Sequence, residues 1–453
     1  MQNYSMLLPR YSIGAEIYNN IPEFCLPYGK KVVAIGGHKA MQAARPEIDR
    51  AINGSGLEII DYIWFGGEAS YENVEMLSAM PEVQQADMIF AIGGGKALDT
   101  CKCLSAKSGK PVFTFPTIAA TCAAVTTVSI MYHADGSFKD MFFFLQPPVH
   151  AFINTAIISA APEQYLWAGL GDTIAKYYEC TVSARGDELE HYFAVGIEIS
   201  RQCVEPLMKY GMKAMEDNNK KVCTYELEQV ILAVIVTTGL VSILITREHT
   251  PDYNSGLAHA IFYTLTTLPH FEETHLHGAV VGFGVLILLL CDNQMDEFER
   301  IYQFNKSVAL PVSLADMKIT HEQMESLLPL LPDTKDLRHY PYAVTVPMLQ
   351  EAFAKLAARN AQDYYHAQYY YSHIHKRTSP KRLVLILWTT TCLVAVCFLI
   401  INNSHRIASE AVRLILHKPL QSAVSAQSAH TAPTAPAEQN GHPSESAHLS
   451  QTS

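Results

Sequence analysis

Residues 93–95 are three consecutive glycines, and they follow a short apolar run, residues 88–92, that is typical of a buried strand. A segment with helical spacing, residues 97–106, begins directly after them. A strand, a glycine turn and a helix in this order let the backbone approach a phosphate group, and the free N–H groups of the helix N-terminus favour its negative charge. Lys96 adds a positive charge. Because the stretch matches neither common phosphate-loop fingerprint, a tight turn without a ligand is the alternative.

The composition limits the partners that the chain can bind. Its 453 residues carry a formal net charge of −11, which argues against a broad nucleic-acid surface, since such a surface needs clustered Lys and Arg. The ten cysteines are scattered, and residues 1–10 do not resemble a secretory signal. These features predict reduced thiols and a cytoplasmic location. A small-molecule substrate is the partner that we expect.

Strand-like and helix-like segments alternate in the first third of the chain. The predicted strands are residues 32–36, 57–65, 88–92 and 111–115, and the intervening helices include residues 38–54 and 71–80. This alternation predicts a parallel sheet with crossover helices, so we assign residues 1–155 to an α/β cofactor-binding domain. The pattern then becomes helical, and we assign residues 156–358 to an all-α domain. Residues 230–245 carry no charge but are too few for a comfortable membrane span, which predicts a buried helix.

The end of the chain differs in composition. Residues 359–382 are a basic linker, and residues 383–401 contain no charge. A helix of that length approaches the thickness of a bilayer's hydrocarbon core, so it is a candidate transmembrane anchor; a terminal helix that packs on a partner is the alternative. The basic residues before it place the preceding domains in the cytoplasm. Residues 402–453 are rich in Ser, Ala, Thr, Pro and Gln, and we expect them to be disordered.

Three residues offer ligands that a divalent metal ion prefers. Asp172 lies near the start of a helical run, and His259 and His277 lie in later segments. One carboxylate with two imidazoles suits Zn²⁺ and Fe²⁺ alike and leaves positions open for a substrate. Because the three are far apart in the sequence, spacing alone also allows three unrelated polar residues. His270 and His275 are competing ligands.

The motifs around these residues resemble those of a known family. They are Gly93-Gly-Gly-Lys-Ala-Leu-Asp99, Pro116-Thr-Ile-Ala-Ala-Thr121, Val128-Ser-Ile-Met-Tyr132, Gly169-Leu-Gly-Asp172, Gly256-Leu-Ala-His-Ala260 and His277-Gly278. These motifs occur in the same order as in the iron-containing alcohol dehydrogenase superfamily. The chain therefore resembles that superfamily, specifically its glycerol-dehydrogenase-like branch, which includes hydroxycarboxylate dehydrogenases. The resemblance implies a dehydroquinate-synthase-like architecture, with NAD(P)(H) on an N-terminal α/β dinucleotide-binding domain and one divalent metal ion in the cleft beneath an all-α C-terminal domain.

The resemblance assigns roles residue by residue. Asp172, His259 and His277 match the metal ligands and are the candidate catalytic residues. The candidate cofactor-binding residues match the phosphate turn, the loop after the next strand and the nicotinamide end: Gly94, Gly95, Lys96, Asp99, Thr117, Ala120, Thr126, Val128 and Tyr132. Phe262 stands where many relatives have a second histidine, so a separate general base is not evident.

Two further positions bear on specificity. After the strand at residues 32–36, Gly37 is followed by His38 and Lys39, without the acid that often binds the adenine-ribose hydroxyls. We therefore expect NADPH to be accepted, and a plain turn with a solvated Lys39 is the alternative. Cys122 is the candidate substrate residue, because the resemblance places an aspartate there in glycerol dehydrogenases. A cysteine in place of that aspartate lessens the repulsion of an anionic substrate.

These observations predict a metal-dependent oxidoreductase that transfers a hydride between NAD(P)H and a small 2-oxo or 2-hydroxy acid. A glycerol or small-polyol dehydrogenase with the same machinery is the first alternative. A dehydroquinate-synthase-like lyase is the second, disfavoured by the motif around His259 and by too few basic residues near the cleft motifs for a phosphate substrate. The last is a membrane-tethered binding module without catalysis. We also expect a homo-oligomer.

Overall fold

The computed structural model describes residues 5–246 and 253–377, with side chains up to residue 365. The described residues up to 367 form one compact unit. The candidate membrane anchor at residues 383–401 and the tail at residues 402–453 lie outside the described residues. Helix α17 continues through residues 359–377, the first part of the segment that we expected to be a linker.

Eight strands form two sheets in the N-terminal part of this unit. They are β1 (Tyr11–Gly14), β2 (Lys31–Gly36), β3 (Glu58–Trp64), β4 (Met88–Gly93), β5 (Val112–Pro116), β6 (Val128–Tyr132), β7 (Phe138–Phe143) and β8 (His150–Asn154). Six of them make a parallel sheet in the order β1-β8-β5-β4-β2-β3, and β6 and β7 make an antiparallel hairpin. The four predicted strands correspond to β2–β5, which confirms the parallel sheet.

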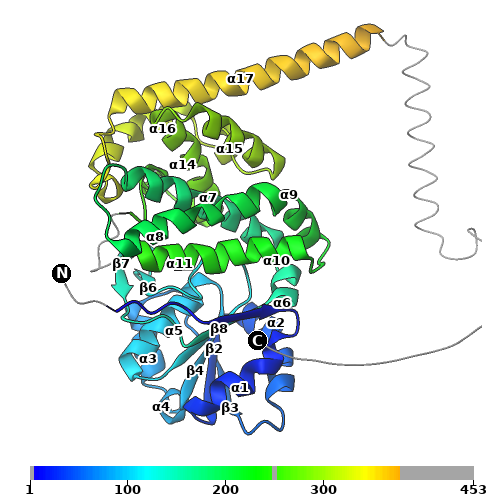
Figure 1. The fold of residues 1–453 in the computed structure, drawn as a ribbon, viewed down its shortest axis with the longest axis vertical. Coiled ribbons are helices and arrows are strands. Elements are labelled where there is room, and N and C mark those ends of the chain that lie inside the picture. The colour runs from blue at the N-terminus through cyan, green and yellow to red at the C-terminus, as the bar shows by residue number, and fades with distance from the viewer. Residues whose placement is uncertain (1–4, 247–252, 378–453) are drawn as a thin grey trace, which may run out of the picture. The chain divides into compact units, whose positions relative to one another are not determined.

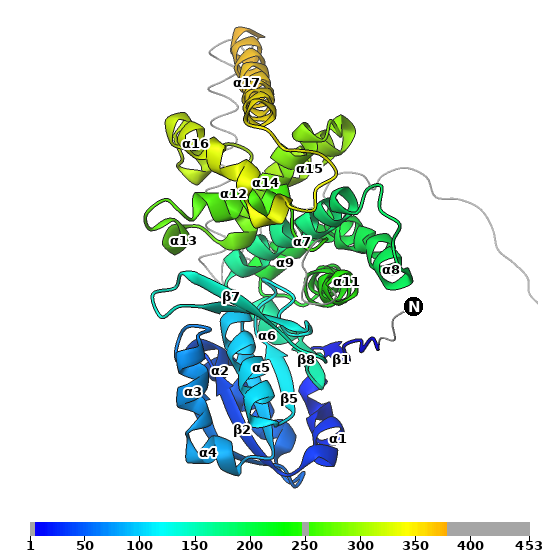
Figure 2. The same ribbon diagram turned by 90° about the vertical axis from the view of Figure 1, so that its left-hand side faces the viewer.

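Helices cover both faces of this sheet (Figure 2). They are α1 (Ile21–Cys25), α2 (His38–Ile52), α3 (Tyr71–Ser78), α4 (Pro81–Gln85) and α5 (Gly95–Ser108). Every residue of β4 is buried, as expected of a central strand with two covered faces. Along β4, Ile89 packs in the cluster with α3 and α5, whereas Phe90 packs in the cluster with α1 and α2. The sheet is therefore the middle layer of an α/β sandwich.

The chain after β8 is helical (Figure 1). Its helices are α6 (Thr155–Ala160), α7 (Glu163–Ser183), α8 (His191–Ile199), α9 (Glu205–Asn219), α10 (Tyr225–Ile231), α11 (Thr238–Ile245), α12 (Leu257–Leu265), α13 (Phe271–Thr274), α14 (His277–Cys291), α15 (Met295–Ser307), α16 (His321–Leu327) and α17 (Val346–Arg377). The predicted fold class, an α/β part followed by a helical part, is confirmed. The boundary at residue 155 stays a prediction.

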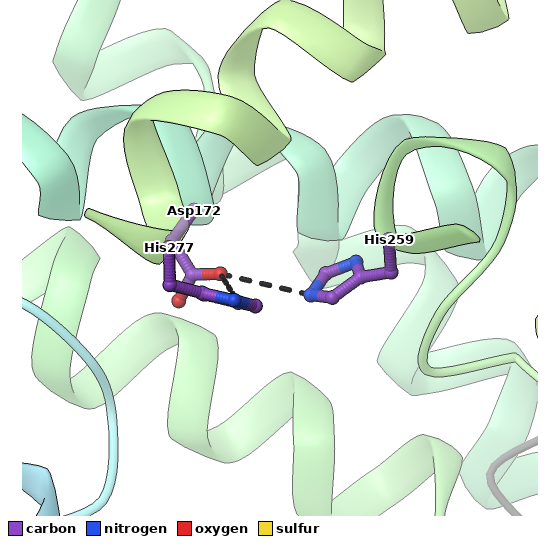
Figure 3. Close-up of side chains that lie close together, drawn as sticks. All are labelled: Asp172, His259 and His277. Carbon is purple, nitrogen blue, oxygen red and sulfur yellow. Dashed lines mark ion pairs between the residues drawn. The ribbon is translucent and has the colours of Figure 1, made fainter. Parts of the chain in front are cut away.

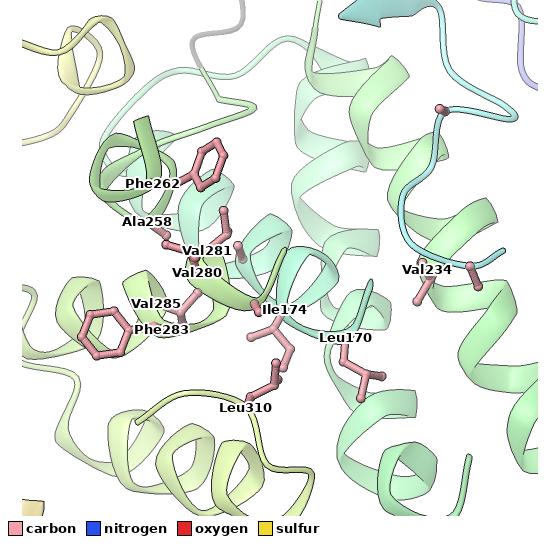
Figure 4. Close-up of a cluster of buried hydrophobic side chains, with 14 of the residues drawn as sticks. Leu170, Ile174, Val234, Ala258, Phe262, Val280, Val281, Phe283, Val285 and Leu310 are labelled. Atoms are coloured by element: carbon pink, nitrogen blue, oxygen red, sulfur yellow. The ribbon is translucent and has the colours of Figure 1, made fainter. Parts of the chain in front are cut away.

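Helix α14 is the centre of the helical part. All its residues from Gly278 to Cys291 are buried, so it is apolar on every side, as a helix surrounded by other helices must be. Helices α7 and α12 pack against it, and Figure 4 shows Ile174 of α7, Ala258 of α12 and Val281 of α14 in one apolar cluster. This packing brings together three segments that the chain separates.

One helical stretch of the described residues, Tyr225–Ile245, is long and apolar enough to cross a membrane. It consists of α10, a π-helical segment (Leu232–Thr237) and α11. Most of it is buried inside the protein, as predicted for residues 230–245. Burial of this kind is typical of a core helix.

Candidate metal centre and cofactor site

The three predicted metal ligands lie together in the helical part. Asp172 is on α7, His259 is on α12 and His277 is the first residue of α14. One potential ligand atom from each lies within 4.8 Å of the others. The Asp172 Oδ1 atom lies 3.2 Å from His277 Nε2 and 3.7 Å from His259 Nε2 (Figure 3).

Glycines allow the three helices to approach closely enough for this cluster to form. A Cβ atom on Gly278 would lie 2.0 Å from the Ala168 carbonyl oxygen and 2.9 Å from Asp172 Cβ. A Cβ atom on Gly284 would lie 2.7 Å from the Cα atom of Ala258. Backbone cannot yield as a flexible side chain does, so the crossings of α14 with α7 and with α12 both require glycine. The same crossings set the distances between the three ligands.

A buried carboxylate orients one of the histidines. Glu179 lies on α7 and is fully buried. Its Oε2 atom lies 2.5 Å from His259 Nδ1, and its Oε1 atom accepts hydrogen bonds from the backbone N–H groups of His259 and Gly256, both at 2.9 Å. A proton on Nδ1 leaves the lone pair of Nε2 directed at the cluster, the usual arrangement of a metal-binding histidine. Burial lowers the pKa of His259, but Glu179 and Asp172 outweigh it and raise that pKa above its ordinary value.

The cluster fits a divalent ion. It supplies one carboxylate and two imidazoles, and the carboxylate of Glu179 stands behind one imidazole. His277 is more exposed than Asp172 and His259, so one side of the cluster faces an accessible space. Three ligands with an open side are typical of a catalytic metal centre, because the remaining positions can take water or a substrate.

The two competing histidines do not join this cluster. His270 is exposed and its Nδ1 atom lies 2.8 Å from Glu273 Oε1. The Nε2 atom of His275 lies 2.9 Å from the Met317 carbonyl oxygen. Within the described residues, Asp172, His259 and His277 are the group of His, Cys, Asp and Glu residues that could hold a metal ion.

The glycine turn lies where a parallel sheet usually binds its ligand. After β2 the chain goes to β3 on one side, and after β4 it goes to β5 on the other. Ligands of such sheets bind at this change of direction, beyond the carboxyl ends of the strands. Gly37 follows β2 and Gly94 follows β4 as the residue before α5. The first N–H groups of α5 have no partner within the helix and can bind an anion.

Lys96 and Tyr132 flank this turn. The Nζ atom of Lys96 lies 2.6 Å from Glu68 Oε2 and 5.3 Å from the centre of the Tyr132 ring. The backbone N–H of Tyr132 donates to the Ala69 carbonyl oxygen, which fixes β6 near the turn. Gly95 is the first residue of α5. Lys96, the cation beside the turn, is thus paired with a carboxylate in this structure.

Asp99 is placed differently from the turn glycines. Its carboxylate is buried, with Oδ1 at 2.9 Å from Lys102 Nζ and Oδ2 accepting a hydrogen bond from the Ile130 N–H at 3.3 Å. Lys102 also donates to the Thr126 hydroxyl at 3.0 Å and to the Val128 carbonyl oxygen at 2.5 Å. Asp99, Thr126 and Val128 thus join α5 to β6, and in this structure they support the site from behind.

The loop after β5 packs between the glycine turn and α7. The backbone N–H of Thr117 donates to the Gly93 carbonyl oxygen at 3.1 Å, so this loop lies beside the glycine turn. Further along, Ala120 packs against α7, where a Cβ atom on Gly169 would lie 3.2 Å from its Cα atom. Gly169 is three residues before Asp172. The loop therefore runs from the cofactor turn to the metal ligands.

Cys122 lies in the middle of this loop, which spans residues 117–127. Burial raises the pKa of its thiol to about 11; Lys176 lowers that pKa and Asp172 raises it. Both charged side chains are therefore within electrostatic reach of the thiol. The Cβ atom of Cys122 packs against α11, where a Cβ atom on Gly239 would lie 3.6 Å from it, and the raised pKa keeps the thiol neutral near pH 7.

The sequence analysis did not identify Lys176 and Glu179, two charged residues of α7, as parts of the site. Asp172, Lys176 and Glu179 follow a spacing of four and three residues, which puts them on one face of the helix. Lys176 and Glu179 are both buried. Three charges on one stripe of an otherwise apolar helix were a visible signal, because charged residues are rarely buried without a function or a partner.

Comparisons with known proteins agree with this geometry. The sequence profile described as "Iron-containing alcohol dehydrogenase" matches residues 9–153. A glycerol dehydrogenase of Thermotoga maritima is 34% identical over 279 residues, 58% of this chain and 71% of that protein. Hydroxycarboxylate dehydrogenase A of Escherichia coli is 30% identical over 336 residues, 73% of this chain and 90% of that protein. A solved structure of glycerol dehydrogenase from Schizosaccharomyces pombe superposes with a TM-score of 0.70 at 22% identity, covering 80% of this chain and 92% of its own, which shows the shared fold.

Proposed function

The chain belongs to the iron-containing alcohol dehydrogenase family of metal-containing oxidoreductases, and we propose that it transfers a hydride between NAD(P)H and a small 2-oxo or 2-hydroxy acid. The observation that carries the proposal is the cluster of Asp172, His259 and His277. The loop that begins beside the glycine turn packs on α7 at Gly169, one turn before Asp172. Its homo-oligomeric state and its cytoplasmic location stay predictions.

Each part of the site has a distinct task in this reaction. Asp172, His259 and His277 hold the divalent ion, and the N–H groups at the start of α5 hold the pyrophosphate of the cofactor. When bound, the ion supplies Lewis acidity at the substrate oxygen, and the nicotinamide supplies or accepts the hydride. Glu179 keeps His259 in one tautomer and one orientation. The buried ring of Phe262 packs edge-on against the His277 ring, with ring centres 4.3 Å apart, and keeps water away from that side of the cluster.

Cys122 favours an anionic substrate over a polyol. Its thiol carries no charge near neutral pH, because burial raises its pKa to about 11. An aspartate at this position would add a negative charge near Asp172 and repel a carboxylate. The relatives support both substrate classes, since glycerol dehydrogenases and a hydroxycarboxylate dehydrogenase are among them. Glycerol oxidation is therefore the second candidate.

We expect native protein to reduce 2-oxobutyrate more efficiently than it oxidises glycerol, and Cys122→Asp to shift this preference toward glycerol. A unit charge a few ångströms from a bound carboxylate is expected to change the ratio of the two kcat/KM values by about tenfold. Steady-state assays with both substrates and both nicotinamide cofactors measure the ratio. Cys122→Asn is the matched control, because asparagine has nearly the same shape as aspartate but carries no charge. Equal ratios in the two variants, or native protein that prefers glycerol, would contradict the proposal.

Gly37 tests the expectation that NADPH is accepted. It has an extended conformation with φ of −78°, and a Cβ atom there would meet only the Phe65 ring, at 3.8 Å, so other residues fit without strain. His38 and Lys39 follow it and are exposed. We expect Gly37→Asp to raise the Kd of NADPH about tenfold more than that of NADH, because the carboxylate repels the 2′-phosphate. Fluorescence titration measures both, with Gly37→Asn as the uncharged control. An unchanged Kd ratio would show that the phosphate does not approach this turn.

A further inference from the structure

We propose that the Lys176 ammonium group binds the carboxylate of the substrate and thereby selects 2-oxo and 2-hydroxy acids over neutral alcohols. This inference rests on the function proposed above. It assigns the recognition of the acid to one side chain, whereas the metal ligands and the cofactor turn act on any alcohol. Four observations support it: the position of Lys176, its partners, the balance of charge, and its effect on Cys122.

The position of Lys176 follows from the helix that carries it. It lies on α7 one turn after Asp172, and Glu179 lies almost one turn further along the same face. Lys176 acts electrostatically on both Asp172 and His259. Residues four apart on a helix are neighbours, so Lys176 lies beside Asp172. From there we expect its ammonium group to reach a substrate whose carboxyl group is bonded directly to the reacting carbon.

Within residues 5–246 and 253–365, the hydrogen-bond partners of Lys176 carry no charge. Its Nζ atom donates to two neutral acceptors of Asn254, the carbonyl oxygen at 2.9 Å and Oδ1 at 2.6 Å. In the described part of the chain it forms no ion pair, although it is almost fully buried. Lys102, an equally buried lysine, pairs with Asp99 at 2.9 Å. An ammonium group has three donors, so Lys176 keeps one for an additional acceptor.

The charge balance of the site favours an anion once the metal is bound. A bound divalent ion would be neutralised by the carboxylates of Asp172 and Glu179, with His259 and His277 as neutral imidazoles. Asp336 and Lys335, the other charged groups around Tyr263, are opposite in sign to each other. The charge of Lys176 would then be left over in a buried position, where an unpaired charge is costly. A substrate with one carboxylate neutralises it, and glycerol does not.

Cys122 is the second residue that bears on the recognition of the acid. Its thiol is subject to the charges of both Lys176 and Asp172, and it is only partly buried. A carboxylate at position 122 would compete for the Lys176 ammonium group. An uncharged residue there leaves that group for the substrate, so the two positions act together on the same specificity.

The experiment compares an acid and a neutral alcohol in Lys176→Met, with both proteins loaded with Zn²⁺. Binding of oxamate, an unreactive analogue of a 2-oxo acid, is measured by calorimetry, and kcat/KM is measured for 2-oxobutyrate and for propane-1,2-diol. Loss of a buried charged partner is expected to weaken oxamate binding about 30-fold or more. The ratio of acid to diol kcat/KM should fall by at least about tenfold. Lys176→Arg should recover part of both losses.

Two further variants separate local contact from general charge. Lys335→Met removes an exposed cation at the neighbouring hairpin, where its Nζ atom lies 4.3 Å from the centre of the Phe138 ring, and it should leave oxamate binding unchanged. Asn254→Asp places a carboxylate beside the Lys176 Nζ atom and should weaken oxamate binding while the lysine is retained. If Lys335→Met weakens oxamate as much as Lys176→Met does, the recognition is not local and the inference is wrong.

The outcomes also distinguish this inference from the proposed function. If native protein binds oxamate and reduces 2-oxobutyrate, and Lys176→Met does both equally well, the function stands and the role of Lys176 is refuted. If the variant loses acid and diol turnover in parallel together with its Zn²⁺, Lys176 is only a structural link between α7 and Asn254. If native protein neither binds oxamate nor reduces the acid, the proposed substrate class itself is wrong.

Discussion

His259→Ala is expected to abolish hydride transfer and the retention of the metal ion while the protein stays folded. The imidazole Nε2 atom lies 3.7 Å from Asp172 Oδ1 and is one of three ligand atoms, so its loss leaves two. Lewis-acid stabilisation is worth several kcal/mol, which corresponds to a loss of kcat/KM of about a thousandfold or more. Metal content after dialysis, thermal unfolding and steady-state turnover are measured on the same preparation.

A graded series sharpens this result. Glu179→Gln keeps all three ligands but removes the carboxylate that orients His259, so we expect a smaller loss of metal affinity, about 10- to 100-fold. His270→Ala is the matched histidine control, because His270 is exposed and pairs with Glu273 alone. Near-native metal content and turnover in His259→Ala would overturn the assignment of His259 as a metal ligand. A loss of metal in His270→Ala would instead support His270 as a ligand.

Four of the six strands of the parallel sheet were predictable, whereas β1, β8 and the hairpin strands were not. Strands β2, β4 and β5 are buried and appear in the sequence as continuous apolar runs between turn signals. Strand β3 lies at a sheet edge and is mostly not buried, but Gly66 and Gly67 mark its end in the sequence. Strand β1 lies at the sheet edge and is only partly buried, and the hairpin strand β7 alternates exposed and partly buried residues. Strand β8 is fully buried, but it is five residues long and contains His150. Short or mixed segments of this kind depend on their neighbours, which the local pattern does not contain.

The candidate site was likewise predictable only in part. Asp172, His259 and His277 were named from motifs, but nothing in their spacing along the chain predicted that they would lie within 4.8 Å of each other. That distance follows from helix crossings, which are tertiary. The stripe of charges on α7 could have indicated Glu179, but its contact with His259 depends on the crossing of α7 and α12, which only the fold shows.

Gly278→Ala is expected to damage the site through the fold rather than through a ligand. The added Cβ atom would lie 2.0 Å from the Ala168 carbonyl oxygen and 2.9 Å from Asp172 Cβ, so α14 and α7 must separate. Overpacking against backbone typically lowers the free energy of unfolding by about 1–3 kcal/mol. His277 is the neighbouring residue, so the same displacement moves its Nε2 atom, now 3.2 Å from Asp172 Oδ1, and weakens metal binding.

Stability and metal binding should therefore fall together in Gly278→Ala, and a second glycine separates the two effects. Gly211 lies on α9, where a Cβ atom would meet the Phe304 ring at 2.9 Å and no backbone within 4 Å. Gly211→Ala should have a smaller effect on unfolding, because a side chain can yield and alanine favours the helix by about 1 kcal/mol. It should leave the Zn²⁺ affinity unchanged, since α9 carries no ligand. Chemical denaturation and metal titration of both variants test this. If Gly278→Ala retains native Zn²⁺ affinity, the close crossing of α7 and α14 does not set the geometry of the metal centre.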